Sequence, residues 1–453
     1  MTFALFLLYV ALSYIHPGQI APALAPYRIT YWVGIAGLAV ASVSLLNRRI
    51  GVLVNFQFWA LLVFTAVMCA SLMIAERWLG APLLAIQRFG PSLTIFVLAL
   101  CSVTSLRRLR IASGVVIVLT LLLTLQGAAA YHFGYNAQLF LTQRATTSDE
   151  AVFEIDEALA GLADVAQGDG YPSEDSQWRP PRIRALGSMN DPNDLALGMI
   201  VAMGLIAGVW KPRPRPGNLL LGAAAIALVY GVYLTRSRGG AVALVILLWR
   251  VAASRLGRVP ALALLVTLGA GLLAIDLGGR SVSVDLDESA AERLVAWTEG
   301  FEMLKASPIL GVGYGQFVEH HPLTAHNSLV LCFAETGLLG CFFWVSLFVV
   351  TALELRWMAR LAGDDPRDAI ARHWAEGLQF ALVGFIVAAF FLSRTFVPML
   401  YLLIGLAAAL ATIMRAEGKS VPLPALPVLG LIVLACEIGG IGIVYSLVKL
   451  RLA

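Results

Sequence analysis

The chain has 453 residues, of which 32 are basic and 28 acidic, giving a formal net charge of +4. Hydrophobic residues make up 59% and charged residues only 13%, against ~25% charged in typical soluble domains. With a mean hydropathy of +0.82, this composition excludes a soluble enzyme, a disordered chain and a disulfide scaffold. The apolar residues run continuously instead of alternating with polar ones, which also excludes a transmembrane β-barrel.

Runs of about 20 apolar residues, each long enough to cross a ~30 Å hydrocarbon core as a helix, recur along the chain. We therefore predict an all-α polytopic integral membrane protein with about 12–13 transmembrane helices and two longer periplasmic loops. The predicted spans are 2–16, 27–46, 51–75, 90–106, 111–130, 194–210, 218–234, 239–254, 260–278, 327–352, 376–394, 399–414 and 424–447. The first run lacks a positively charged n-region, so we expect it to be an uncleaved span.

Positive charge distinguishes the two sides of the predicted membrane protein. With a cytoplasmic N-terminus, alternate short connections hold more than half of the 32 basic residues: Arg48/Arg49, Arg107/Arg108/Arg110, Lys211/Arg213/Arg215, Arg250/Arg255/Arg258, Arg356/Arg360/Arg367/Arg372 and Arg415/Lys419. Cytoplasmic loops carry the excess of Lys and Arg, so these residues orient the chain and do not indicate nucleic-acid binding. A thirteenth span would leave Lys449 and Arg451 outside, so either the last run is re-entrant or one earlier run is not a span.

The predicted spans divide the chain into five regions. These are an N-terminal transmembrane bundle (1–130), an acidic periplasmic loop (131–193), central transmembrane helices (194–278), a periplasmic catalytic loop (279–326) and C-terminal transmembrane helices (327–453). In the first loop, Ser148-Asp149-Glu150 predicts a capped short helix through residue 166. In the second, a helix is expected from Asp287 to Ala306, followed by a glycine-punctuated turn at 311–315.

Residues 235–240, Thr-Arg-Ser-Arg-Gly-Gly, lie between two apolar spans with almost no loop to solvate Arg236 and Arg238. One interpretation is a pair of interfacial arginines whose side chains reach the lipid headgroups. We favour an anion clamp at the outer face, because a guanidinium binds phosphate oxygens bidentately and keeps its charge. The adjacent glycines would let a ligand approach the backbone closely.

Further arginines add positive charge on the same predicted side: Arg182, Arg184, Arg280 and Arg293. Arg293 lies on the expected loop helix, where a simple solvated position is the alternative. Arg182 and Arg184 precede the Asp191-Pro192-Asn193 turn, whose residues start the next helix. Helix initiation alone is sufficient to explain that turn.

Three histidines, His320, His321 and His326, end the second loop. They lack i,i+4 pairing and a carboxylate at ligand spacing, and the five cysteines form no C-x-x-C pair, so we expect no metal and no cofactor. His326 lies at the membrane boundary, where a neutral imidazole can accept a proton from an attacking hydroxyl; a helix-cap role is the alternative. Glu335 follows about 13 Å deeper along a helix, where it either pairs with an arginine or locks two helices together.

Four features in this order resemble the O-antigen ligase and O-antigen polymerase superfamily of bacterial envelope glycosyltransferases. The first two are the Asp191-Pro192-Asn193 turn and the 235–239 turn. The third is the loop helix with Arg293, Trp297 and Met303, which leads to the segment Pro-Ile-Leu-Gly-Val-Gly-Tyr-Gly-Gln-Phe at 308–317. The fourth combines His326-Asn327-Ser328-Leu329 with Glu335-Thr336-Gly337-Leu338-Leu339-Gly340. The resemblance covers roughly residues 180–345. Elsewhere it extends only to the many-spanning architecture.

The resemblance implies transfer of a glycan from undecaprenyl diphosphate, without metal or nucleotide, at the periplasmic face of the bacterial inner membrane. Matched position by position, it implies that Arg238 and Arg293 engage the diphosphate and that His326 activates the acceptor, which is a lipid, a glycan or a protein. We place Arg236, Arg182, Arg184, Arg280, Asn327 and Glu335 among the substrate-binding residues. The long acidic 131–193 insertion and the compact second loop depart from typical ligases, so both ligation and polymerisation in lipopolysaccharide or exopolysaccharide synthesis remain open.

A polytopic membrane protein could also belong to two other classes of function. A solute transporter would show inverted repeats and paired broken helices near the membrane midplane, whereas here the polar groups cluster at the outer face. A non-catalytic scaffold would use the acidic loop to bind envelope partners. The resemblance and the basic residues of the outer face favour the transferase.

Overall fold

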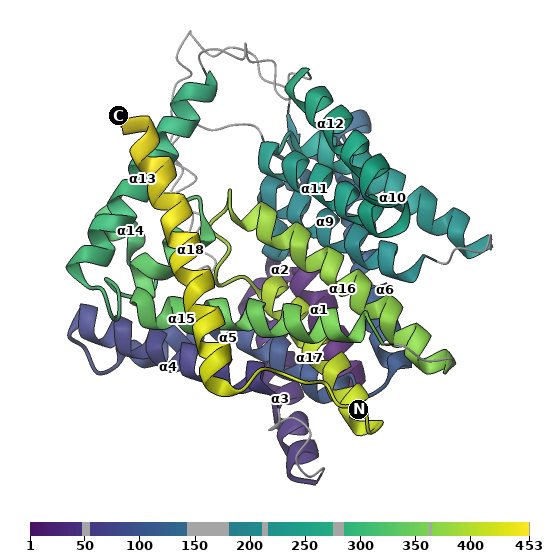
Figure 1. Ribbon diagram of the computed structural model, residues 1–453, viewed down its shortest axis with the longest axis horizontal. Helices are drawn as coiled ribbons and strands as arrows, with labels where there is room; N and C mark the ends of the chain where they lie inside the picture. Colours follow the sequence, from purple (N-terminus) through teal and green to yellow (C-terminus); the bar gives the residue numbers. More distant parts are fainter. Residues whose placement is uncertain (48–54, 143–180, 211–215, 275–284, 362–364, 453) are drawn as a thin grey trace.

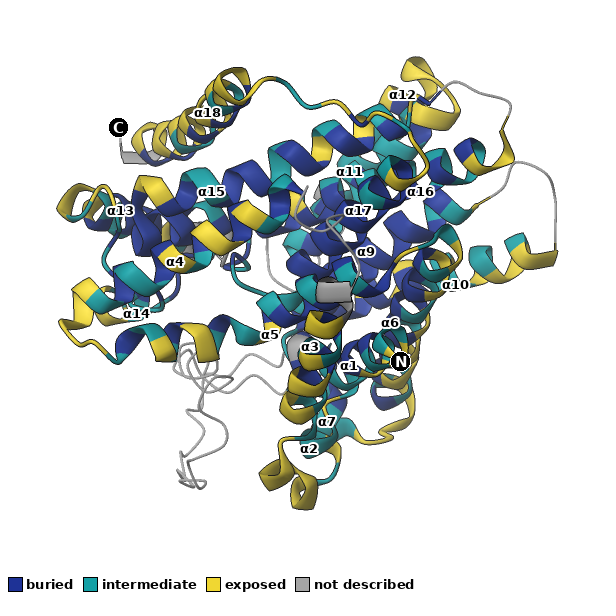
Figure 2. Ribbon diagram, turned by 90° about the horizontal axis from the view of Figure 1, so that it is seen from below, coloured by how far each residue is buried: buried dark blue, intermediate teal, exposed yellow. Residues whose placement is uncertain are grey.

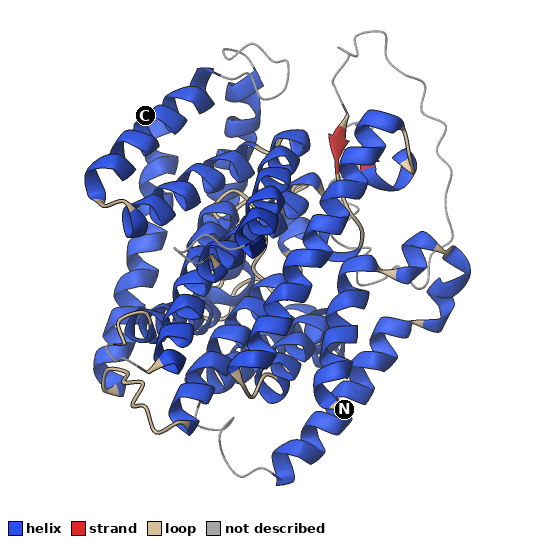
Figure 3. Ribbon diagram, turned by 90° about the vertical axis from the view of Figure 1, so that its right-hand side faces the viewer, coloured by secondary structure: helices blue, strands red, loops and turns tan. Residues whose placement is uncertain are grey.

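The computed structural model describes residues 1–47, 55–142, 181–210, 216–274, 285–361 and 365–452. The described part is almost entirely helical, as Figure 3 shows. Its one strand pair is short and antiparallel, with Leu141 of β1 (Leu141–Thr142) opposite Ile183 of β2 (Arg182–Ile183). The helix expected at 149–166 and the predicted site residue Arg280 lie outside the described residues.

Every predicted span overlaps one helix of the structure. These helices are α1 (Thr2–Ile15), α3 (Ile29–Asn47), α4 (Phe56–Glu76), α5 (Ala81–Ser102), α6 (Leu106–Phe133), α9 (Pro192–Val209), α10 (Pro216–Thr235), α11 (Arg238–Arg255), α12 (Arg258–Ala274), α15 (Ser328–Met358), α16 (Pro366–Ala389), α17 (Pro398–Ala416) and α18 (Leu426–Leu452). α5 and α16 begin well before the predicted residues 90 and 376. Polar residues such as Arg88 and His373 interrupt the hydropathy there but not the helix.

Shorter elements connect these helices. They are α2 (Pro17–Ile20), the 3-10 helix η1 (Pro22–Tyr27), α7 (Ala137–Phe140), the 3-10 helix η2 (Gly187–Met189) and α14 (Phe317–His320), together with the longer loop helix α13 (Asp285–Ala306). The helix expected from Asp287 to Ala306 is confirmed by α13.

Within the described residues, nine helices are long and apolar enough to cross a membrane by length and composition. This confirms the all-α polytopic class. Four of the thirteen helices that overlap predicted spans are not among the nine: α3, α11, α12 and α16. α11 carries Arg238, Arg250 and Arg255, and the apolar part of α12 is short. α18 is one continuous helix, which argues against the re-entrant alternative for the last run.

The core of the molecule lies along α9, α16 and α17, whose side chains are mostly buried; α9 and α17 appear dark blue in Figure 2. α9 and α16 pack closely because glycines line the contact. A Cβ on Gly204 would lie 2.4 Å from Ala381 N, and one on Gly208 would lie 2.4 Å from Gly377 Cα. Small residues of this kind let membrane helices approach backbone to backbone, where dispersion contacts replace a missing hydrophobic effect.

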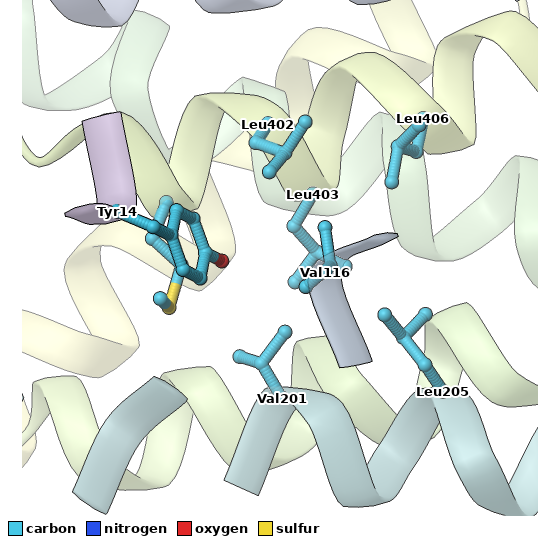
Figure 4. A pocket seen from close by; sticks show the side chains of 8 residues that line it. Tyr14, Val116, Val201, Leu205, Leu402, Leu403 and Leu406 are labelled. Carbon is cyan, nitrogen blue, oxygen red and sulfur yellow. The ribbon is translucent and has the colours of Figure 1, made fainter. Parts of the chain in front are cut away.

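The outer helices expose apolar side chains, as expected for surfaces that face lipid. α10, α12 and α18 carry exposed Leu, Ile and Val residues, and α18 crosses the outside of α15 in Figure 1. A small pocket inside the bundle is lined by Tyr14 and by aliphatic side chains from α6, α9 and α17 (Figure 4). Because its lining is almost wholly apolar, it is a packing feature and not a candidate site for charge-stabilised chemistry.

One end of the bundle gathers the predicted site turns. α10 ends at Thr235, whose carbonyl accepts a hydrogen bond from Arg182 Nε at 2.8 Å. Asn327, which precedes α15, donates from Nδ2 to Phe390 O just beyond α16 at 3.0 Å. The starts of α9, α11, α15 and α17 and the ends of α10 and α16 therefore meet at the same end.

The opposite end gathers basic residues that were predicted to be cytoplasmic. Arg255 donates to Ala207 O near the end of α9 at 3.0 Å, and Arg415 forms an ion pair with Glu354. Lys419 Nζ lies 2.8 Å from Asp368 Oδ2. The structure thus separates the predicted site arginines from these basic groups by the length of the helices.

Candidate functional site

The turn before α9 connects several predicted site residues. Asp191 caps α9, and its Oδ1 accepts a hydrogen bond from Asn193 N at 2.7 Å, which confirms the predicted helix start. Arg182 donates one hydrogen bond to Asn193 Oδ1 at 3.2 Å and another to Thr235 O at 2.8 Å. Arg182 therefore joins the start of α9 to the turn that carries Arg236 and Arg238.

That second turn places Arg238 at the first position of α11. Ser237 caps the helix, with its Oγ accepting from Gly240 N at 3.1 Å. Arg236 has a positive φ of 52°, and its guanidinium lies 4.5 Å from the Tyr233 ring centre. Arg238 is half-buried at a helix N-terminus, where the backbone dipole also favours an anion.

Residues 390–397, which connect α16 to α17, form the turn around which the site is built (the 390–397 turn). α11 packs against it, since a Cβ on Gly239 would lie 3.0 Å from Phe391 Cβ. Loop helix α13 reaches the same place: the Trp297 ring packs on Phe390, and its Nε1 donates to Ala325 O at 3.0 Å. Arg293 lies one helical turn before Trp297, on the same face of α13.

The backbone around His326 is fastened to the 390–397 turn by a group of hydrogen bonds. Thr324 Oγ1 and His326 N donate to Ser393 Oγ, Asn327 Nδ2 to Phe390 O, Ser328 Oγ to Leu392 O, and Arg394 N to Ser328 Oγ. His326 has a φ of 48°, a left-handed conformation that is sparsely populated outside glycine. Such a conformation persists where contacts with the surrounding structure hold the backbone in place, and these hydrogen bonds provide such contacts.

Burial and nearby charged groups both act on the imidazole of His326. Burial, followed by the positive charges of Arg293 and Arg394, lowers the pKa of His326 to about 4, while Asp191 acts in the opposite direction. These interactions require Arg293, Arg394 and Asp191 to lie near the ring. The structure therefore brings together His326 and Arg293, and the neutral imidazole is able to accept a proton at ordinary pH.

Arg394 is a site residue that the sequence did not reveal. Its Nε donates to Asp194 in an ion pair, and its Nη1 donates to Ser393 O at 3.2 Å. Arg394 is the last residue of the predicted span 376–394, and its apolar neighbours dominate the hydropathy there. An arginine inside an apolar run was the available signal, since such residues mark functional or paired positions.

Two predicted binding residues contribute chiefly to local structure. Asn327 is fully buried and caps α15, with Oδ1 accepting from Leu329 N at 2.9 Å and Val330 N at 3.1 Å. Arg184 donates to Gln138 O at 3.0 Å; burial lowers its pKa and Asp191 partly offsets this. Arg184 lies at the edge of the site, on the side of α7.

Glu335 lies apart from the arginine turns. Its carboxylate is 3% exposed and accepts hydrogen bonds from Gly315 N at 2.9 Å and Phe317 N at 3.2 Å. These two hydrogen bonds fasten α15 to the 311–317 segment, as expected for a lock between elements. The glycines of the motif allow the contact: Gly311, at a φ of 70°, has no room for a Cβ, which would lie 2.3 Å from Glu335 C.

Replacing Glu335 with alanine is expected to destabilise the protein, because the buried N–H of Phe317 and the part-buried N–H of Gly315 would lose their acceptor, at up to ~1–3 kcal/mol each. Thermal unfolding in detergent measures the effect. Glu302→Ala is the matched control, since Glu302 forms an exposed pair with Lys305, and such pairs contribute ~0–1 kcal/mol. Equal melting temperatures for the two variants would contradict the locking role.

The three histidines have separate environments. His320 is exposed on α14, whereas His321 Nδ1 lies 2.8 Å from Leu323 O and 3.1 Å from Leu323 N. Across the described ranges, His, Cys, Asp and Glu side chains form no group of three or more that could hold a metal ion. Only His326 among the three is fastened to the 390–397 turn.

One family model matches part of the chain. Residues 223–345 match the family model described as O-Antigen ligase, a region that contains Arg236, Arg238, Arg293 and His326. No curated protein matches the chain. Arg182, Arg184 and Arg394 lie outside the matched region. The resemblance to the O-antigen ligase and polymerase superfamily, predicted from the sequence, is confirmed over residues 223–345.

Proposed function

We propose that the protein transfers a glycan from undecaprenyl diphosphate to an acceptor hydroxyl at the periplasmic face of the bacterial inner membrane. The observation that carries the proposal is the proximity of His326 and Arg293, at the helix end where Arg238 also lies. The family match supports the class of reaction. The predicted orientation, with the opposite helix end rich in arginine, supports the periplasmic placement.

The reaction needs two contributions from the protein. The acceptor oxygen attacks the anomeric carbon, the bond from that carbon to the diphosphate oxygen breaks, and its electron pair leaves with the diphosphate. Arg238 and Arg293 stabilise the negative charge that grows on this leaving group, the largest effect available in a water-poor site. His326 takes the proton of the acceptor hydroxyl. The single displacement inverts the anomeric configuration.

The cations around His326 have a second consequence for its role as base. Without a donor, burial and then these cations hold the imidazole neutral, with a pKa of about 4. An anionic diphosphate placed among the same arginines would offset their charge, and a nearby anion raises the pKa of an imidazole. Donor binding would therefore make His326 a stronger base at the moment when it is needed.

This coupling predicts a pH dependence. The acidic limb of kcat/KM reports the free enzyme and is expected near pH 4, because His326 must be neutral and its pKa is about 4. The acidic limb of kcat reports the donor complex and is expected at a higher pH. Initial rates from pH 3 to 8 measure both limbs, and the diphosphate diester stays ionised over this range. Coincident limbs near the ordinary histidine value of ~6.5 would contradict the coupling.

The direct test uses the purified full-length protein with a synthetic undecaprenyl-diphosphate-linked glycan. The expected result is release of undecaprenyl diphosphate together with a glycosylated acceptor of inverted anomeric configuration. A transporter or a scaffold would leave the donor intact. Retained configuration in the product would contradict the single displacement.

The same assay separates ligation from polymerisation. A polymerase joins lipid-linked repeat units, so donor alone would yield longer lipid-linked chains. A ligase requires a separate acceptor and yields no longer chains from donor alone. We propose ligation first, because the matching family is described as O-Antigen ligase.

A further inference from the structure

Arg394 and Asp194 form an ion pair that joins the 390–397 turn to the first turn of α9. Both side chains are 14% exposed, so the pair is largely withdrawn from solvent. Both residues lie outside the region that matches the family model. The pair lies beside the candidate site and takes no direct part in the proposed chemistry.

The position of the pair follows from the hydrogen bonds of the turn. Arg394 N donates to Ser328 Oγ at 2.7 Å, and Thr395 Oγ1 donates to Ser328 O at 2.6 Å. Ser393 Oγ accepts from His326 N at 2.8 Å. A movement of Arg394 would therefore move the backbone that presents the imidazole.

The pair also affects the charge at the imidazole. The groups that face His326 are Arg293 from α13, Arg394 from the 390–397 turn, Asp191 from the start of α9 and His321 from the segment after α14. Arg293 and Arg394 oppose protonation of the ring, His321 does so more weakly, and Asp191 favours it.

We propose that Arg394 is a positioning residue for the proposed transfer: paired with Asp194, it holds the His326 backbone against α9 and places a permanent positive charge near the imidazole. The inference rests on the proposed function of His326 as base. Arginine suits this role because its planar fork binds a carboxylate with fixed geometry and its charge is permanent. Lysine would keep the charge but lose the geometry.

The test compares Arg394→Gln with Arg394→Lys in the full-length protein. In Arg394→Gln, the acidic limb of kcat/KM is expected to move to higher pH, because removing a cation raises the pKa of His326. In Arg394→Lys, the limb is expected to stay near the wild-type position, while kcat falls ~10–100-fold through misplacement of the base. KM for the donor is expected to change less than kcat in both variants.

A second readout does not need turnover. Carbethoxylation modifies neutral imidazole, so its pH dependence at the His326 peptide, followed by mass spectrometry, reports the pKa of that ring. The midpoint is expected to rise in Arg394→Gln and to stay in place in Arg394→Lys. The wild type could release no undecaprenyl diphosphate while this midpoint still moved in Arg394→Gln. That result would contradict the proposed transferase activity and would still support the electrostatic effect of Arg394 on His326.

Arg415 provides the matched control at the opposite helix end. It forms a comparable ion pair with buried Glu354, so Arg415→Gln removes a partly buried cation, 21% exposed against 14% for Arg394, far from the site. This variant is expected to lower thermal stability without moving either the acidic limb or the carbethoxylation midpoint. An unmoved midpoint in Arg394→Gln, or an equal shift in Arg415→Gln, would overturn the proposal.

Discussion

Replacing His326 with alanine is expected to lower kcat for glycan transfer by ~10²–10⁴-fold, the range contributed by a general base. KM for the lipid-linked donor is expected to change little, since the arginines that bind the diphosphate remain. The physical reason is the location of the neutral imidazole beside Arg293, at the helix end where Arg238 lies. Steady-state release of undecaprenyl diphosphate measures both constants.

His320→Ala is the matched control for this variant. His320 is exposed on α14 and makes no contribution to the proposed chemistry, so its replacement is expected to leave kcat within about twofold of the wild type. Melting temperatures show whether either variant has lost its fold. A His326→Ala protein that melts normally and turns over at the wild-type rate would remove His326 from the mechanism.

Replacing Arg238 with lysine is expected to lower kcat/KM for the donor by ~10–100-fold, the loss of one hydrogen bond to a charged group. Lysine preserves the charge but not the fork that grips two phosphate oxygens. The half-buried position at the start of α11 adds to the expected loss, because lysine would not restore the geometry there. Donor titrations at fixed acceptor concentration measure the change.

Arg258→Lys serves as the control for Arg238→Lys. Arg258 begins α12 at the opposite end of the bundle and is exposed, so its replacement is expected to leave kcat/KM unchanged. Wild-type turnover in Arg238→Lys would favour the alternative in which these arginines only reach the lipid headgroups.

Much of the fold was predictable because the hydropathy along the chain predicts where membrane helices lie. Apolar runs of about 20 residues located every main helix, and the Asp191 turn located the start of α9. The predicted positions of the helix ends were less accurate where polar residues lie inside helices. α5 extends through Arg88, since a helix satisfies its own backbone hydrogen bonds whatever the side chains face.

The candidate site was predictable only in part. Arg238, Arg293 and His326 stood out as basic and imidazole groups where few are expected, and the structure brings Arg293 to His326. Arg394 was missed because hydropathy averages over neighbours, and because its pairing with Asp194 joins residues that are 200 positions apart. Such a contact depends on how the helices pack.

Glu335 shows a second limit of sequence reasoning. Its depth in an apolar helix predicted a protein partner but left open which one. The structure shows backbone N–H groups of the 311–317 segment as partners, made accessible by glycines at positive φ such as Gly311. A backbone donor carries no signature in the sequence.

A donor-binding measurement distinguishes most directly between the role of the base and the role of the arginines. In protein carrying His326→Ala, which stalls the reaction, equilibrium affinity for the synthetic lipid-linked donor is measured with and without Arg238→Ala or Arg293→Ala. The expected result is near wild-type affinity with His326→Ala alone and a loss of at least ~10-fold when either arginine is also removed. Equal affinity in all three proteins, each melting normally, would contradict a diphosphate site built from these arginines beside His326.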